Sequence, residues 1–164
     1  MTEADLPFEV LQDPYGIAFW PEFKGRDGCR TPMPWDGKLT HAGFTRGQPW
    51  LPVPPEHAAC AVAGLEREPY SVLNFARNLI QWRKTVLPLT LGDISFFNAP
   101  EPILALQREL DGKNVFAAFN LSDRPQSFEW PLAAAAQALT GHGLPGAKTG
   151  ARLELPAYGG WFGA

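Results

Sequence analysis

The residues best suited to chemistry stand close together in 25–36, which reads Gly-Arg-Asp-Gly-Cys-Arg-Thr-Pro-Met-Pro-Trp-Asp. Arg26 and Arg30 lie four residues apart among glycines and prolines, which disfavour helix and strand and predict a rigid, irregular loop. A guanidinium held in such a loop presents a planar fork of donors that suits a carboxylate or paired sugar hydroxyls. From the residues alone, Arg26 could either clamp a polar ligand or form a structural ion pair. For Arg30, which precedes Thr31-Pro32, a structural ion pair is the favoured interpretation.

Carboxylates are the second candidate for chemistry, because the first 36 residues contain seven: Glu3, Asp5, Glu9, Asp13, Glu22, Asp27 and Asp36. A glycosidase needs two carboxyl groups about 5 to 9 Å apart, one of them acting as an acid. The spacing does not show that any two of these acids face each other. In loops rich in proline, aspartate commonly caps turns, and we expect that role for Asp13 and Asp36.

Other catalytic and metal-binding patterns are missing from the sequence. His41, His57 and His142 have no metal-ligand spacing to another ligand residue, so we expect surface histidines. Cys29 and Cys60 lie far apart and are interpreted as two free thiols in a reducing compartment. No nucleophile elbow precedes a helix and no phosphate loop follows a strand. We therefore expect no metal and no cofactor.

Composition excludes several classes of partner. The net charge is −3 and no stretch concentrates lysine and arginine, which argues against nucleic acid or a membrane surface as the partner. No charged-then-apolar leader and no apolar run near 18 residues occurs, so the expected location is the cytoplasm. With 45% hydrophobic residues the chain has ample material for a core.

The chain changes character twice. Residues 1–56 contain nine prolines and three tryptophans, which predicts a long loop-rich segment that packs against another surface. Residues 70–87 predict a helix, with Ser71 as its N-cap and Pro88 as its stop. The apolar stripe of this helix is Val72, Phe75, Leu79, Trp82 and Val86. A short helical turn is also expected within 57–64.

From about residue 91 the pattern is typical of short strands bounded by turn residues. The expected strands are Leu91–Phe97, Ile103–Leu110, Lys113–Asn120, Gln126–Trp130, Ala151–Leu155 and Tyr158–Phe162. Asp111-Gly112 separates two of them and predicts a two-residue hairpin. Residues 132–150 are interpreted as a long connection. The predicted fold class is mixed α+β, with an antiparallel β-sandwich after a loop-rich segment and one long helix.

Several segments resemble the C-terminal third of bacterial α-glucosidases, in the oligo-1,6-glucosidase branch of the α-amylase-type glycoside hydrolases. The resemblance lies in residues 11–16 (Leu-Gln-Asp-Pro-Tyr-Gly), 20–35 (from Trp-Pro-Glu-Phe-Lys to Thr-Pro-Met-Pro-Trp), 43–45 and 49–51. Ser71-Val72-Leu73-Asn74, with Arg77, Leu79 and Arg83-Lys84, resembles the last helix of that family's catalytic barrel. The resemblance is specific up to about residue 97 and looser over the strands.

The resemblance implies two domains: residues 1–89 as the tail of a catalytic (β/α)₈ barrel and residues 90–164 as a C-terminal antiparallel β-domain. The tail would comprise the long loop after the eighth strand and the last helix. The family hydrolyses α-glucosidic bonds with retention, using an aspartate nucleophile, a glutamate acid/base and a second aspartate. Those acids follow the fourth, fifth and seventh barrel strands, so no residue of this chain takes a catalytic role. The chain is expected to be inactive alone.

By the same resemblance, Arg26 matches an arginine that reaches the terminal glucose of an oligosaccharide and pairs with an aspartate from an early barrel loop. Glu3 lies where relatives place a polar contact to the leaving-group sugar. The expected partner is an oligosaccharide with a terminal α-glucose, provided that the rest of the barrel is present. Trp35 and Trp50, flanked by prolines, are interpreted as packing residues rather than sugar platforms.

Two other functions remain open: a free-standing β-sandwich module that binds carbohydrate or a partner chain, and a small enzyme that uses its own carboxylates. The loop at 25–36 argues against a binding module, which has no use for a loop that closes a barrel. Without the barrel, the first segment and the helix would expose apolar surface. We therefore expect self-association, a partner chain that carries the rest of the barrel, or partial disorder before residue 70.

Overall fold

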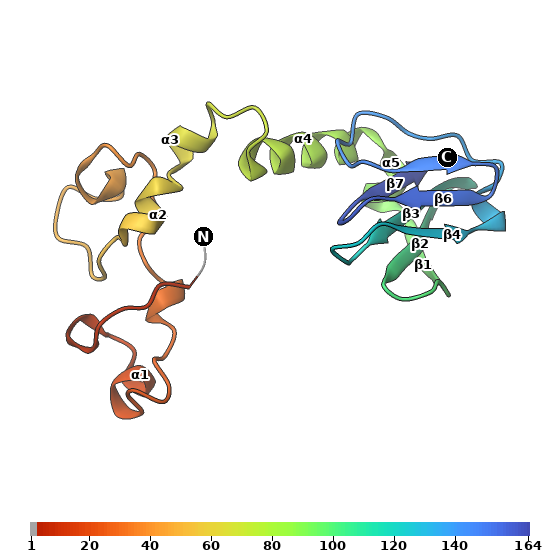
Figure 1. Cartoon of the computed structure of the whole chain (residues 1–164). Helices are drawn as coiled ribbons and strands as arrows, with labels where there is room; N and C mark the ends of the chain where they lie inside the picture. Colours follow the sequence, from red (N-terminus) through yellow and green to blue (C-terminus); the bar gives the residue numbers. More distant parts are fainter. Residues whose placement is uncertain (1–2) are drawn as a thin grey trace. The chain divides into compact units, whose positions relative to one another are not determined.

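The computed structural model describes residues 3–164. The chain forms two compact units, Met1–Asn74 and Phe75–Ala164 (Figure 1). The boundary between them lies inside the long helix, whereas the sequence places its domain boundary at 89/90. That boundary concerns a catalytic barrel and stays a prediction.

The first unit consists of loops and short helices, and its described residues form no β-strand. Prolines cap or begin several helices, because a residue without an amide hydrogen costs little in the first turn. Its small apolar core contains Ala4, Leu6, Leu11 and Leu51, with Val10 and Trp20 against it. The helices are η1 (Phe8–Val10), α1 (Pro14–Ala18), η2 (Asp27–Cys29), η3 (Thr40–Gly43), α2 (Pro55–Ala59) and α3 (Val62–Leu65).

The long helix α4 (Val72–Thr85) confirms the helix that the sequence predicts, with ends two residues inside the expected range. Ser71 caps it as expected, since its Oγ accepts the amide of Asn74 at 3.2 Å. The residues of the apolar stripe are half-buried within the chain, except for Val72 at its start. Trp82 packs on Phe162 at a ring distance of 4.8 Å, whereas Val72 is 80% exposed.

The sequence predicts that Pro88 ends the long helix, and this prediction is wrong. Helix α4 ends at Thr85, and Pro88 lies in the first turn of a second short helix, α5 (Leu87–Leu91). Proline is tolerated in a first turn because the amide there has no partner within the helix. The predicted helical turn within 57–64 is present as parts of α2 and α3.

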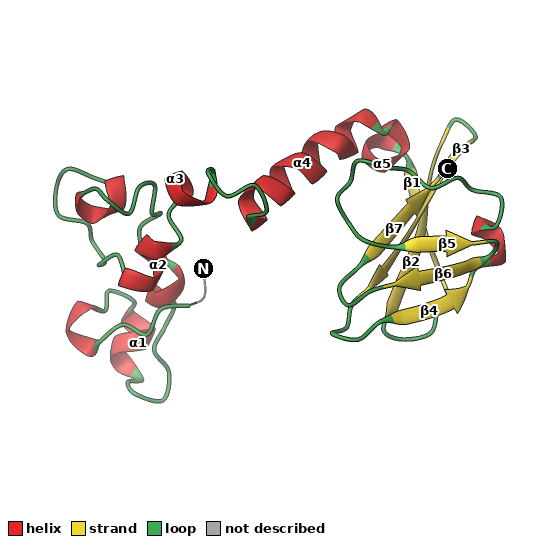
Figure 2. Ribbon diagram, turned by 45° about the horizontal axis from the view of Figure 1, so that its top comes forward, coloured by secondary structure: helices red, strands yellow, loops and turns green. Residues whose placement is uncertain are grey.

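The second unit is a sandwich of two antiparallel sheets, which confirms the predicted fold class (Figure 2). One sheet has the strand order β1-β2-β3-β7 and the other β4-β6-β5. The strands are β1 (Asp93–Phe97), β2 (Ile103–Leu110), β3 (Lys113–Asn120), β4 (Gln126–Glu129), β5 (Ala147–Thr149), β6 (Arg152–Leu155) and β7 (Gly160–Gly163). A 3₁₀ turn, η4 (Pro131–Ala133), follows β4.

The larger sheet is apolar on both faces because each face has its own cover. Ala118 pairs with Trp161, and both belong to the core between the two sheets. Their neighbours Ala117 and Phe162, also paired, belong to a second cluster that includes Trp82 of α4. Successive strand residues point to opposite faces, so β3 and β7 appear in the sequence as continuous apolar runs rather than alternating ones.

The hairpin and the ranges of β2 and β3 are as predicted, whereas the other strands differ: β4 ends at Glu129 and β6 begins at Arg152, each one residue inside its expected range. Asp111 and Gly112 both have positive φ (51° and 78°), as a type I′ turn between β2 and β3 requires. Strand β1 begins at Asp93 because Leu91 belongs to α5, and β7 begins only at Gly160 because Tyr158 is left-handed. The predicted connection 132–150 contains β5, which pairs with β6.

Over residues 3–164, no helix has the length and apolar character needed to cross a bilayer.

Candidate functional site

Two buried aspartates join the segments on either side of the cis Trp20-Pro21 loop. The Oδ2 atom of Asp27, a fully buried residue, accepts the backbone amides of Gln12 (2.6 Å) and Asp13 (2.7 Å). The carboxylate of Asp13 in turn accepts the amides of Tyr15 (2.9 Å) and Arg26 (3.0 Å). Each aspartate therefore binds the backbone beside the other, an arrangement that we call the aspartate clasp.

Asp13 also confirms two expectations about its neighbours. It caps α1 through Tyr15, as predicted for an aspartate in this loop. Its Oδ2 lies 3.5 Å from a guanidinium nitrogen of Arg30, so Arg30 makes the expected structural ion pair. Amide hydrogen bonds, that of Arg26 foremost, lower the pKa of Asp13 despite the opposing effect of desolvation, and the charge of Arg30 lowers it further.

Arg26 is the arginine that remains available. Its backbone is bound by Asp13, but its side chain is exposed and makes no hydrogen bond or ion pair within the described part of the chain. The residue before it, Gly25, has φ of +70°, and a Cβ there would lie 2.8 Å from the Asp13 carboxyl carbon. Only glycine fits at that position, so the backbone that leads into Arg26 is held tightly.

Glu3 is exposed and lies beside the same loop. It lines a cavity of 310 Å³ together with Asp5, Lys24 and Gly28. Lys24 forms an ion pair with Asp5, and its ammonium lies 5.2 Å from the ring centre of Trp20. Within the described part of the chain, residues 3–164, Glu3 and Arg26 share no hydrogen bond or ion pair. The assignment of both as substrate-binding residues stays a prediction.

The two tryptophans interpreted as packing residues are each about half covered within this chain, so their packing against a further surface stays a prediction. Trp35 is 52% exposed and Trp50 is 56% exposed. Asp36, in contrast, caps its turn as predicted, because its Oδ1 accepts the amide of Lys38 at 3.0 Å.

The prediction of surface histidines is wrong for two of three. His57 is 2% exposed, and its Nδ1 lies 2.9 Å from the hydroxyl of Thr31. His142 is 8% exposed, receives the amide of Leu144 and contacts Phe162 at a ring distance of 4.9 Å. Burial lowers the pKa of His142 more than its hydrogen bond to a backbone carbonyl raises it. Both cysteines are free, as predicted, and both are exposed.

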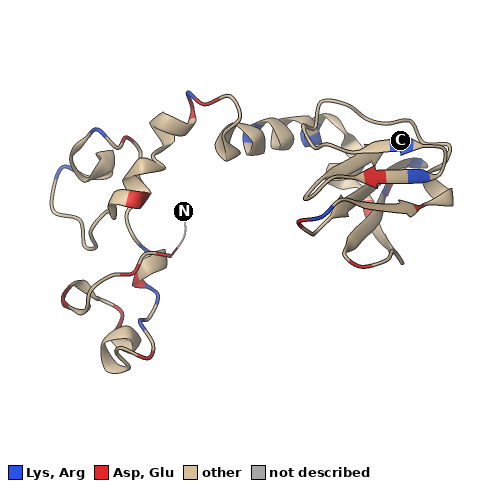
Figure 3. Cartoon of the chain, viewed as in Figure 1, with Lys and Arg blue, Asp and Glu red and all other residues tan. Residues whose placement is uncertain are grey.

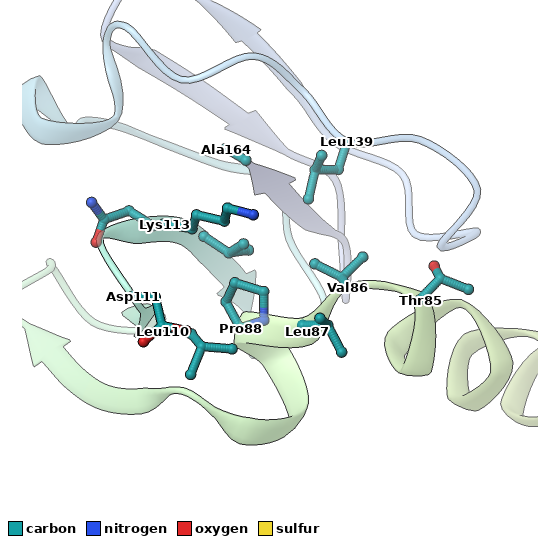
Figure 4. A pocket seen from close by; sticks show the side chains of 11 residues that line it. Thr85, Val86, Leu87, Pro88, Leu110, Asp111, Lys113, Leu139 and Ala164 are labelled. Atoms are coloured by element: carbon teal, nitrogen blue, oxygen red, sulfur yellow. The ribbon is translucent and has the colours of Figure 1, made fainter.

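The second unit has a cavity of 540 Å³ beside α5 and the β2–β3 hairpin (Figure 4). Its wall is mostly apolar, with Val86, Leu87 and Leu139 among the lining residues. The charged side chains in the wall are Asp111 and Lys113, at the hairpin. One carboxylate in an apolar wall does not provide the acid pair that a glycosidase requires.

Charged residues of both signs are interspersed along the chain (Figure 3). Within residues 3–164, no group of three or more histidine, cysteine, aspartate or glutamate residues could hold a metal ion.

The sequence analysis did not single out Asp27, which is the most deeply buried acid of the loop. Its hydrogen-bond partners, the amides of Asp13 and Gln12, lie 14 and 15 residues away along the chain, so no local sequence pattern could indicate these hydrogen bonds.

Comparisons with known proteins place this geometry in a family context. The family model for the α-amylase catalytic domain matches residues 1–92. A probable α-glucosidase of Rhizobium meliloti (strain 1021) is 42% identical over 162 residues, which are 99% of this chain and 29% of that protein. A probable oligo-1,6-glucosidase of Bacillus subtilis (strain 168) is 36% identical over 126 residues, 76% of this chain and 22% of that protein.

Solved structures agree with these relatives. The alpha-glucosyl transfer enzyme XgtA superposes with a TM-score of 0.90 at 43% identity, over 99% of this chain and 30% of that enzyme. The trehalulose synthase MutB from Pseudomonas mesoacidophila MX-45 gives a TM-score of 0.74 at 26% identity, over 98% of this chain and 32% of that enzyme. The chain thus spans less than a third of the length of these relatives. Because the family model covers more than half of the sequence, this chain belongs to the α-amylase family.

Proposed function

We propose that the chain is the C-terminal part of an exo-acting, retaining α-glucosidase that hydrolyses α-glucosidic bonds of malto- or isomalto-oligosaccharides. The supporting observation is the match of nearly the whole chain to a probable α-glucosidase, together with a loop whose one uncommitted cation is Arg26. The catalytic carboxylates belong to other parts of the barrel, and the chain by itself does not hydrolyse glucosides.

Arg26 acts at the non-reducing end of the substrate. Its guanidinium offers donors in a plane, which suits a terminal sugar hydroxyl and an aspartate from elsewhere in the barrel at the same time. Such a pair closes the pocket beyond the terminal glucose, so the enzyme removes single glucose units. Glu3 contributes a polar contact on the leaving-group side.

The test uses a chimera in which this chain replaces the matching 162 residues of the Rhizobium meliloti protein. We expect the chimera to hydrolyse p-nitrophenyl α-glucoside and the purified chain alone to show only background. Arg26→Ala in the chimera leaves a buried carboxylate unpaired, which costs on the order of 3 kcal/mol, or about 100-fold in kcat/KM.

Arg46→Ala is the matched control, because Arg46 is an exposed arginine of the same unit. It should leave kcat/KM within about twofold. Equal losses of kcat/KM from the two substitutions would show that Arg26 does not bind the substrate. Turnover by the isolated chain, abolished by changing one of its own acids, would refute the proposal that the catalytic acids lie elsewhere. Oligosaccharide binding by the isolated chain without turnover would favour the free-standing module.

The apolar surface of the first unit provides the contact with the rest of the enzyme. Several aromatic side chains there are more than half exposed, among them Tyr15 (67%), Phe19 (56%) and Trp50 (56%). Monomeric soluble proteins rarely leave contiguous patches of this kind uncovered. We expect the isolated chain to self-associate in sedimentation velocity at micromolar concentration. A monomer with fully protected amides before residue 70 would contradict this expectation.

A further inference from the structure

The aspartate clasp bears directly on Arg26, although neither aspartate needs to touch a substrate. Arg26 lies immediately before Asp27, whose buried carboxylate binds the amides of Gln12 and Asp13. The amide of Arg26 itself is bound by Asp13. The backbone is therefore fixed at Arg26 and at the next residue, by two carboxylates that belong to opposite sides of the loop.

The clasp also separates the roles of the two arginines. Arg30 has its guanidinium 3.5 Å from the Asp13 carboxylate, so that cation is committed to the loop. Arg26 is bound through its backbone only, and its guanidinium has no partner among the described residues. One carboxylate thus neutralises one arginine and holds the other at its main chain, which leaves a single cation to project from a fixed point.

The contacts around the clasp leave little room for adjustment. A Cβ at Gly16 would lie 2.5 Å from the carbonyl oxygen of Lys24, and one at Gly28 would lie 2.2 Å from the carbonyl oxygen of Ala4. The two sides of the loop at Gly16 and Lys24, and the loop and the preceding segment at Gly28 and Ala4, thus approach each other as closely as glycine allows. A loop packed this tightly transmits the loss of a hydrogen bond as a backbone shift.

We propose that Asp13 and Asp27 are positioning residues that fix the backbone of Arg26 and thereby aim its guanidinium at the terminal sugar. This inference rests on the proposed function, because it gives Arg26 the role stated there. Its physical basis is that a displacement of about 1 Å at a substrate-binding group can reduce catalysis about 100-fold. The long side chain of Arg26 can hold one direction only if its main chain does not move.

The activity test compares Asp27→Asn, Asp27→Ala and Arg26→Ala in the chimera. Asparagine retains one oxygen where Oδ2 now accepts two amides, and should stay within a few-fold of the unsubstituted chimera. Alanine removes both hydrogen bonds and should lower kcat/KM about 10- to 100-fold. The double variant Asp27→Ala/Arg26→Ala should be no worse than Arg26→Ala alone, because a displaced arginine and a missing one have the same consequence. Additive losses would mean that Asp27 acts on stability and would overturn the inference.

A second measurement does not depend on activity. In the isolated chain, amide hydrogen exchange at Arg26 should be at least 10-fold faster in Asp27→Ala than in the unsubstituted chain, and nearly unchanged in Asp27→Asn. Asp36→Ala is the control, since Asp36 caps a separate turn at Lys38. Unchanged exchange at Arg26 overturns the inference whether or not the chimera is active. An inactive unsubstituted chimera refutes the proposed function, and the exchange rates then decide alone whether the clasp positions Arg26.

Discussion

Asn120 is the residue whose loss we expect to destabilise the sandwich most clearly. It is 2% exposed at the end of β3. Its Nδ2 donates to the carbonyl oxygens of Arg124 (2.6 Å), Pro156 (2.9 Å) and Leu155 (3.3 Å). Its Oδ1 accepts the amide (3.0 Å) and the hydroxyl (2.8 Å) of Ser122. One side chain thus ties β3 of one sheet to the end of β6 in the other.

The expected cost of Asn120→Ala follows from these five hydrogen bonds. A neutral hydrogen bond contributes about 1 kcal/mol net, and leaving its buried partner unsatisfied costs about 1–3 kcal/mol. The two groups of Ser122 can turn to water, so the three carbonyl oxygens dominate. We expect a loss of about 3 kcal/mol in the free energy of unfolding of the second unit, a fall in Tm of roughly 12–24 °C for a unit of this size.

Hydrogen exchange of peptides from β2 and β3 measures this loss within the second unit alone. A loss of about 3 kcal/mol should accelerate the slowest amides more than 100-fold. Asn114→Ala on the same strand is the control, because Asn114 is exposed, and it should change stability by less than about 0.5 kcal/mol.

Asn120→Asp is the sharper variant. It keeps the size of the side chain but replaces the amide donors with a carboxylate that faces three carbonyl oxygens. It should therefore be at least as destabilising as alanine at neutral pH, with partial recovery in acid, where a protonated carboxyl regains one donor. If Asn120→Asp is neutral at pH 7, the hydrogen bonds of Asn120 do not carry the stability that we assign to them.

Two further predictions concern single positions. Gly16→Ala should disrupt the first unit by more than 2 kcal/mol, because its Cβ would lie 2.5 Å from the backbone oxygen of Lys24, whereas Gly64→Ala in α3 meets nothing within 4 Å and should be neutral or slightly stabilising in the same urea titration. The buried imidazole of His142 has a lowered pKa, so the unfolded chain gains its proton first as the pH falls, and the second unit should lose stability as the pH falls below about 6.5. The urea midpoint between pH 8 and pH 5 measures this slope, and a slope unchanged by His142→Gln would show that His142 is not its source.

The elements that sequence patterns predicted well are those set by neighbours along the chain. The type I′ turn at Asp111-Gly112 fixes the register of the hairpin, so β2 and β3 begin and end where predicted. Capping by Ser71 and Asp13 is likewise local, because each side chain accepts an amide two or three residues further on. The ion pair of Arg30 followed from the rigidity of its loop.

The elements that were missed depend on contacts between distant residues. Strand β5 is three residues long and lies in an alanine- and glycine-rich stretch, and its only signal is its pairing with β6. His57 and His142 are buried by neighbours that no periodic pattern identifies. Asp27 resembles an ordinary loop aspartate until the fold brings Gln12 and Asp13 to its carboxylate.

The loop that contains the aspartate clasp fixes its own backbone by hydrogen bonds but leaves much of its apolar surface uncovered, and the buried Oδ1 of Asp27 has no hydrogen-bond partner. Its backbone is fixed by the aspartate clasp and by its tight glycine contacts, whereas Trp35 and Trp50 remain more than half exposed. An aromatic residue of 150–250 Å² that is half exposed leaves about 100 Å² to bury, worth about 2–3 kcal/mol at about 25 cal/mol per Å². The loop can therefore hold its shape alone, while several such side chains together favour a second surface strongly. Under the proposed function, a preformed loop that meets its partner through aromatic side chains is what an arginine of fixed direction at a shared active site requires.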